Sequence, residues 1–181
     1  MDYISLQEAE WEYNQKLEID FVNMLKGTVR HPDQDEMRLR LIKFLRNNAI
    51  GTLSTCYDDL PRATPVRYKS KDVDIYILTE GGGKIFNIRR NPSVSFSIHG
   101  RYAGFTTCRC AQLWGQAALI EHHDADYARA YDIMGLGIRQ DLSTVDLKAV
   151  QASMCIIKIV PQRARILNLP VGILNAEILF T

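Results

Sequence analysis

A glycine-rich turn followed by a lysine is the part of this chain best suited to hold an anion. Gly81, Gly82 and Gly83 follow an apolar, β-branched run (73–78), and Lys84 opens a short helical pattern. Consecutive glycines allow positive φ angles and a close approach of a ligand to the backbone. A helix start presents unpaired N–H groups, and a lysine adds positive charge beside them. The stretch therefore suits a phosphate group. The alternative is a glycine turn with a solvated lysine, since neither a Walker nor a dinucleotide pattern is present.

Two arginines precede this turn, on a stretch that we expect to be a strand. Arg62 and Arg67 are separated by an odd number of residues, which places their side chains on opposite faces of a regular strand. Pro65 lies between them, and a proline inside a strand is typical of an edge or a bulge. A bulge would shift the phase by one residue, so that both guanidinium groups point toward Lys84. Because guanidinium matches phosphate oxygens, we expect three cations around one phosphate. Three separately solvated side chains are the alternative.

The elements that must position these cations are short strands joined by tight turns. We expect strands at 49–56, 62–69, 73–79, 94–98, 105–120 (with a bulge at Gly115), 154–160 and 163–169. We expect helices within 5–27 and at 33–46, 84–90 and 124–134, and a short one beginning near Ser143. This order predicts a mainly β protein with flanking helices, an α+β fold built on an antiparallel barrel.

The composition is that of an ordinary globular protein of one domain. The 181 residues are 46% apolar and 24% charged, with a net charge of +1, which predicts no strong attraction to nucleic acid or to an anionic membrane. No apolar run approaches the ~20 residues needed to span a bilayer. We expect an N-terminal helical extension (1–34), a barrel domain (35–181), and a cytoplasmic location with reduced thiols.

The remaining reactive side chains do not form a recognisable site. Cys108 and Cys110 share one strand face, but this spacing is not that of a zinc site, and buried or half-buried cysteines are the commoner case. Beside a redox cofactor either thiol could be redox-active. His122 and His123 precede a helix start and have no partner that would make either a general base. The sequence therefore predicts no metal site and no catalytic side chain.

Four short motifs occur in a set order along the chain. They are Arg-Ala-Thr-Pro-Val-Arg (62–67), Tyr-Ile-Leu-Thr (76–79), Gly83-Lys84, and Asn-Pro-Ser-Val-Ser (91–95). Together they resemble the pyridoxamine 5′-phosphate oxidase-like superfamily of FMN-binding split barrels, over about residues 40–120. The order of the motifs is more specific than any one of them.

The resemblance implies a six-stranded antiparallel split β-barrel that works as a homodimer, with FMN at the subunit interface. It assigns the FMN phosphate to Arg62, Lys84 and Arg67, and a hydrogen bond with the flavin to Thr79. Gln112 would contact the ring or ribitol from one of the two subunits. The implied cofactor-binding residues are Arg62, Ala63, Thr64, Pro65, Val66, Arg67, Leu78, Thr79, Gly83, Lys84 and Gln112.

The C-terminus departs from the family pattern. True pyridoxamine 5′-phosphate oxidases end in an arginine- and histidine-containing segment that grips the substrate phosphate, whereas residues 169–181 are mainly apolar. We therefore expect a flavin-dependent oxidoreductase that acts on another small organic substrate and accepts electrons from a donor such as NAD(P)H. The alternatives are a non-catalytic flavin carrier and a split barrel that binds F420 or haem.

Overall fold

One antiparallel sheet, accompanied by helices, forms the body of the protein. The structure is a computed structural model and describes residues 29–135 and 154–180. Within these ranges the sheet has eight strands: β1 (Ile50–Tyr57), β2 (Leu60–Arg67), β3 (Lys69–Lys71), β4 (Asp74–Thr79), β5 (Ser93–His99), β6 (Arg109–Ile120), β7 (Cys155–Asn168) and β8 (Ile173–Leu179). The α-helices are α2 (Gln34–Arg46), α3 (Gly83–Arg90) and α4 (Tyr127–Met134), and two 3₁₀ turns are η1 (Phe105–Thr107) and η3 (Leu169–Val171).

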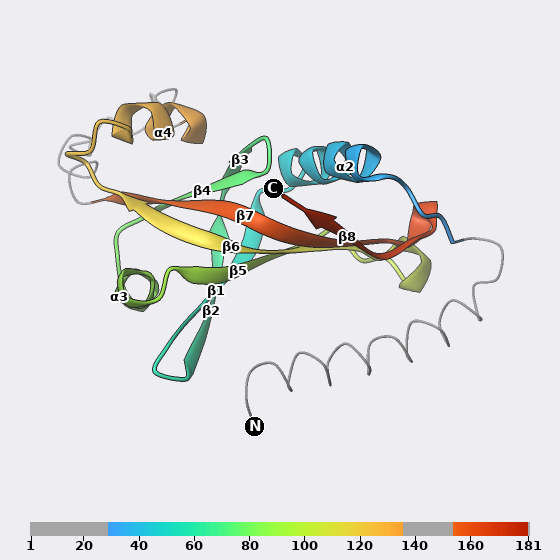
Figure 1. Cartoon of the computed structure of the whole chain (residues 1–181), viewed down its shortest axis with the longest axis horizontal. Helices are drawn as coiled ribbons and strands as arrows, with labels where there is room; N and C mark the ends of the chain where they lie inside the picture. Colours follow the sequence, from blue (N-terminus) through green and yellow to red (C-terminus); the bar gives the residue numbers. More distant parts are fainter. Residues whose placement is uncertain (1–28, 136–153, 181) are drawn as a thin grey trace.

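The sheet curls into a half-barrel, which confirms the predicted split-barrel α+β fold. The strand order is β2-β1-β5-β6-β7-β4-β3, and β8 pairs with β7. The sheet curls so that β2 and β4, which are far apart in this order, come into contact. In Figure 1, α2 and α4 lie on the same side of the sheet, and the β1–β2 hairpin projects away from them. No helix among the described residues is long and apolar enough to cross a membrane.

The seven segments predicted as strands become eight strands, two more than the six of the implied barrel, through three local changes. The segments 154–160 and 163–169 are one strand, β7, because a shift of register opposite Trp114 and Gly115 absorbs Pro161 and leaves Gln162 as the extra residue. A separate three-residue strand, β3, pairs with β4. The C-terminal segment 173–179, for which no strand was predicted, pairs with β7 as β8.

Helix α2 begins and ends where the sequence predicts. The Asp33 carboxylate accepts a hydrogen bond from the Glu36 N–H at 2.8 Å, which satisfies one open donor of the first turn. Met37, Leu41 and Leu45 recur at helical spacing and are at most 1% exposed. Their burial fixes α2 on the core of the half-barrel. The predicted helices within 5–27 and near Ser143 lie outside the described residues, and the division into 1–34 and 35–181 stays a prediction.

The two faces of the sheet differ sharply in character. On the inner face, one row across four strands is fully buried and consists of Leu53, Phe96, Leu113 and Ala164. The adjacent rows on the outer face carry small and polar side chains together with an aromatic ring: Thr52, Ser97, Gln112 and Arg165, then Ser54, Ser95, Trp114 and Arg163. The outer rows are exposed or half-exposed. The inner face forms the core, and the outer face remains available for contacts.

The predicted bulge at Gly115 is confirmed, and it explains why glycine is needed there. A Cβ at Gly115 would overlap the Val160 carbonyl oxygen and lie 2.7 Å from the Cα of Pro161, so the obstruction is backbone. We expect Gly115→Ala to lower the free energy of unfolding by ~1–3 kcal/mol through overpacking. Gly100→Ala is the matched control, because its added Cβ would meet its neighbours at ordinary distances of 3.5 Å or more. Urea unfolding measures both, and equal midpoints would contradict this account.

Candidate functional site

The first turn of α3 lacks the side chains that usually satisfy a helix start. Gly81 and Gly82 have φ angles of 129° and 88°, which favour glycine, and Gly82 caps the helix without a side-chain hydrogen bond. No acidic residue lies in the first turn. The first turn of α3 therefore contains no negative side chain to balance the partial positive charge of the helix start. The glycines also leave space for a ligand to reach the backbone there.

The Arg62 side chain lies directly on this helix start. A Cβ placed on Gly83 would be 2.7 Å from Nε, Cζ and Nη2 of Arg62, so the guanidinium rests against the glycine backbone. Within residues 29–135 and 154–180, no group forms a hydrogen bond or ion pair with this guanidinium. A cation placed against the positive end of a helix is repelled by it, and a bound anion would neutralise both.

Lys84 directly follows Gly83 in the first turn of α3. Its Nζ donates a hydrogen bond to the Gly81 carbonyl at 2.8 Å, which folds the lysine back over the turn. It lines a hollow of about 550 Å³ together with Leu78, Thr79, Glu80, Gly81, Gly82 and Met154. The Thr79 side chain is buried, and its Oγ1 accepts a hydrogen bond from the Gly81 N–H at 3.4 Å. We call Arg62, Gly83 and Lys84 the anion seat.

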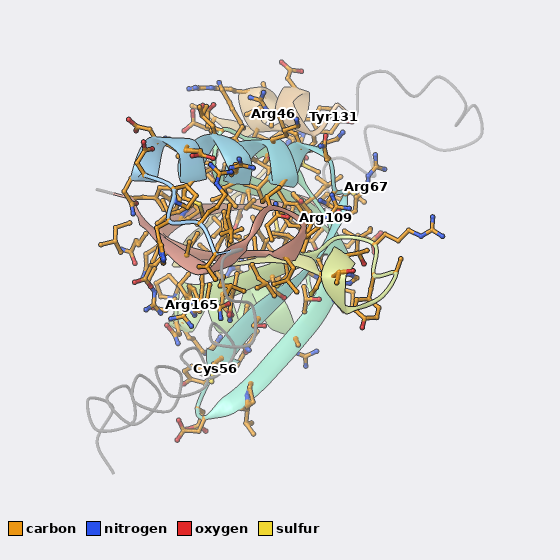
Figure 2. All side chains as sticks on the ribbon, turned by 90° about the vertical axis from the view of Figure 1, so that its right-hand side faces the viewer. Arg46, Cys56, Arg67, Arg109, Tyr131 and Arg165 are labelled. Carbon is orange, nitrogen blue, oxygen red and sulfur yellow. The ribbon has the colours of Figure 1, made fainter. Side chains whose placement is uncertain are left out.

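Arg67 does not join the anion seat within one protomer. The pairing of β2 with β1 is continuous from Ile50↔Arg67 to Tyr57↔Leu60, so of the two alternatives at Pro65 the structure shows an edge strand and no bulge. Without a bulge the odd separation holds, and Arg67 points to the face opposite to Arg62. Figure 2 shows Arg67 at the body end of the hairpin, well away from Cys56 near its tip.

The other predicted site residues divide between the two faces of the sheet. Thr64 and Val66 share the inner face with Arg62, whereas Ala63 and Pro65 lie on the outer face. Gln112 also lies on the outer face and is exposed. The structure thus brings Leu78, Thr79 and Lys84 to one hollow, and places Arg62 against Gly83 at the start of α3. Arg67, Pro65 and Gln112 instead lie on the outer face of the sheet. β2 ends the strand order, so the ladder hydrogen bonds of one of its edges are not made within the sheet.

A buried polar contact holds α3 at the β1–β2 hairpin, and sequence reasoning missed it. Asn87 Nδ2 donates to Thr55 Oγ1 at 3.1 Å, and both side chains are at most 8% exposed. Asn91 Nδ2 also donates to the Cys56 carbonyl at 3.1 Å. These bonds fix the helix start relative to Arg62, which stands opposite Thr55 on β2. The only sequence signal was an asparagine three residues after Lys84, on the inward side of the helix.

The cysteines and histidines form no metal site in the described part of the chain, where no three potential ligands cluster. Cys155, which sequence reasoning did not single out, pairs in register with Thr79, which lines the hollow beside Lys84. Burial raises the pKa of the Cys155 thiol, the Glu121 carboxylate raises it further, and Arg89 and Lys84 oppose the rise. The thiol is therefore protonated near neutral pH and is a poor nucleophile.

A curled antiparallel sheet accompanied by helices is the architecture of a split barrel. The family model for pyridoxamine 5′-phosphate oxidase matches residues 40–168, and the chain belongs to this family. The match includes the whole of β1 to β7, the anion seat and Gln112.

Solved structures share the fold at low sequence identity. A candidate pyridoxamine 5′-phosphate oxidase from Listeria innocua is 24% identical, with a TM-score of 0.57, and the match covers 73% of this chain and 98% of that one. An FAD-binding protein from Mesorhizobium loti is 20% identical, with a TM-score of 0.57 and coverage of 70% and 90%. A heme-binding protein from Mycobacterium smegmatis is 18% identical, with a TM-score of 0.56 and coverage of 84% and 60%. No curated protein sequence matches significantly.

The Asn87–Thr55 contact predicts a specific cost of substitution. Asn87→Ala would leave the Thr55 hydroxyl, which is 3% exposed, without its donor, and we expect a loss of ~1–3 kcal/mol in the free energy of unfolding. Gln116→Ala is the matched control, because it removes a bond of the same kind, to Ser93 Oγ at 3.3 Å, on the exposed surface. Its expected cost is within ~0.5 kcal/mol. Chemical denaturation checks both, and a similar loss in each would contradict the role of burial.

Proposed function

We propose that this protein is a flavoprotein that binds the phosphate of FMN at the anion seat and acts as an oxidoreductase on a small organic substrate. The observation that carries the proposal is the Arg62 guanidinium, unpaired among the described residues and pressed against an uncapped helix start. A dianionic phosphate would neutralise Arg62, the α3 N–H groups and Lys84 together. Membership of the family, and a relative whose name is FAD-binding protein, support a flavin as the bearer of that phosphate.

The flavin ring is proposed to lie along the unpaired edge of β2 and over the hollow beside Thr79. Leu78 and Met154 supply apolar surface in that hollow, and the buried Thr79 places a hydroxyl at its wall. When bound, the flavin supplies the electron and hydride transfer chemistry, which belongs to the cofactor. The chain's own task is to hold the phosphate, orient the ring and exclude water from one side. No side chain at the anion seat is placed as a general acid or base, so the substrate is proposed to react at the ring itself.

We further propose that the site is completed by a second copy of the chain. Gln112 and Arg67 lie on the outer face, away from the anion seat of their own protomer, so they would reach a flavin only across a dimer interface. The outer rows at Ser54, Ser95 and Ser97 are small enough for another sheet or strand to approach closely. A homodimer with two equivalent sites would follow from a two-fold axis.

F420, haem and a non-catalytic carrier are the competing functions. The hollow beside Lys84 is lined by no histidine or cysteine that could bind a haem iron, whereas the Arg62 and Lys84 side chains of the anion seat suit a phosphate. Native mass spectrometry of the purified protein separates FMN, FAD, F420 and haem by mass. Reduction by NADH or NADPH without air, followed by reoxidation by a quinone or a nitroaromatic compound, separates an enzyme from a carrier.

Removal of the two cations tests the proposed phosphate site. We expect Arg62→Ala and Lys84→Ala each to weaken flavin binding by at least about 10-fold, because each loses a charge-assisted hydrogen bond worth ~1.5–3 kcal/mol. Lys43→Ala, on the exposed surface of α2, is the matched control and should bind as the wild type does. Titration with FMN measures the dissociation constants, and wild-type affinity in the double variant would sink the assignment.

A large charged side chain on the outer face tests the dimer. Ser95 is flanked by Ser54 and Trp114 in its cross-strand row, so we expect Ser95→Arg to yield monomers and to weaken flavin binding by removing the partner's residues. Thr106→Arg adds the same side chain to an exposed loop and should leave the dimer intact. Size-exclusion chromatography with light scattering gives the mass. A wild type that is monomeric with flavin bound would contradict the proposal.

A further inference from the structure

A pocket lies between α2, the β3–β4 turn and α4, and the proposed flavin site does not use it. β3 contacts both of these helices, which stand on the same side of the sheet (Figure 1). The volume of the pocket, about 330 Å³, is within the range of small-molecule sites, ~300–1,000 Å³. Three of its lining residues, Val73, Tyr76 and Ala130, are at most 7% exposed, and four basic and three acidic side chains complete most of the lining. We call it the α2–α4 pocket.

Two of the three acidic side chains of the α2–α4 pocket already lie beside a cation. Asp74 Oδ2 lies 3.1 Å from the Nζ of Lys158, and these side chains are only 27% and 33% exposed. Asp72 Oδ1 lies 3.9 Å from Nη2 of Arg46, whose side chain is outside the pocket. Among the described residues, Asp126 is therefore the one acidic side chain of the lining that has no cation within ion-pair distance.

Three basic side chains from three different elements remain without an acidic partner. Arg38 of α2, Lys71 of β3 and Arg129 of α4 all line the pocket. In the part of the chain that the structure describes, none of these side chains forms a hydrogen bond or an ion pair. The Arg38 guanidinium lies 5.6 Å from the centroid of the Phe180 ring, a contact that uses no N–H group. Because Asp126 can balance only one of the three charges, the α2–α4 pocket holds two positive charges in excess.

We propose that the α2–α4 pocket binds a small molecule that carries at least two anionic groups, either carboxylates or phosphates. Two negative charges would balance the excess, and a guanidinium fork matches the oxygens of both kinds of group. The cations come from three elements, so two linked anionic groups can reach more of them than a single one can. A simple monovalent anion would meet one cation at a time and would compete poorly with salt. This inference goes beyond the proposed function, since it involves neither the flavin nor the anion seat.

Isothermal titration of the full chain with citrate and with pyrophosphate tests the proposal, in phosphate-free buffer at constant ionic strength. We expect the tighter of the two probes to bind at least about 10-fold more tightly than acetate, because a second charge-assisted hydrogen bond contributes that much. The preferred probe distinguishes carboxylate from phosphate as the recognised group.

Substitutions in the lining predict effects of opposite sign. Arg129→Gln and Lys71→Gln should each weaken binding by at least about 10-fold, because each removes one charge-assisted contact. Asp126→Asn should tighten binding, because it removes the one unpaired acidic group of the lining. Arg101→Gln and Lys43→Gln are the matched controls, since they remove the same charges from exposed positions outside the pocket, and they should change nothing.

The anion seat also suits these probes, so the titration is repeated on the Arg62→Ala, Lys84→Ala double variant, which should retain the affinity. Binding that is lost in this double variant and kept in Arg129→Gln would overturn the inference and leave the proposed function standing. Equal affinity for acetate and both probes, or an equal loss in Arg101→Gln and Arg129→Gln, would overturn it as well. Failure of the wild type to bind any flavin, with the probes still bound, would overturn the proposed function alone. Circular dichroism verifies that each variant is folded.

Discussion

The placement of one uncompensated arginine beside a helix start is the constraint on which the site depends. Arg62 can lie against α3 because residue 83 has no side chain, and the bonds of Asn87 to Thr55 and of Asn91 to Cys56 help to hold α3 in reach. The exposed Arg62 guanidinium and the positive end of α3 repel each other, and an anion bound between them would relieve that repulsion. The rigid core maintains this arrangement, so an arriving anion is met by groups already in position and little reorganisation opposes its binding.

The two faces of the curled sheet have different roles. The side chains of the inner face form the core: the buried row that contains Leu53 and Phe96 belongs to one cluster with the apolar residues of α2. The outer face carries short polar side chains and the Trp114 ring, which Arg163 covers at 4.2 Å from the ring centroid. A single strand, β2, contributes to both, because its alternate residues point inward and outward without interruption. Residues adjacent in sequence therefore serve different surfaces.

The sequence predicted features that depend on neighbouring residues, such as helix starts and bulges. It did not predict features that depend on the tertiary structure. The acidic cap at Asp33 and the glycine at 115 marked a helix start and a bulge, because each acts through its nearest neighbours. The predicted separation of 154–160 from 163–169 is wrong, because nothing in the sequence shows that a register shift will accommodate Pro161 within one strand. The anion seat followed from the glycine turn and the resemblance. The face of the sheet on which Arg67 lies depended on whether β2 contains a bulge. The solvent exposure of Tyr57 and Phe86 depended on the whole fold.

The two prolines of β2 limit the pairing of this edge strand with other chains. A strand at the end of a sheet can template further strands and so seed fibrils, but Pro61 and Pro65 have no N–H to offer an incoming chain. The same edge can still accept a small rigid molecule that needs only scattered hydrogen-bonding groups. An edge that lacks these N–H groups pairs poorly with another chain, so the two prolines limit aggregation at β2.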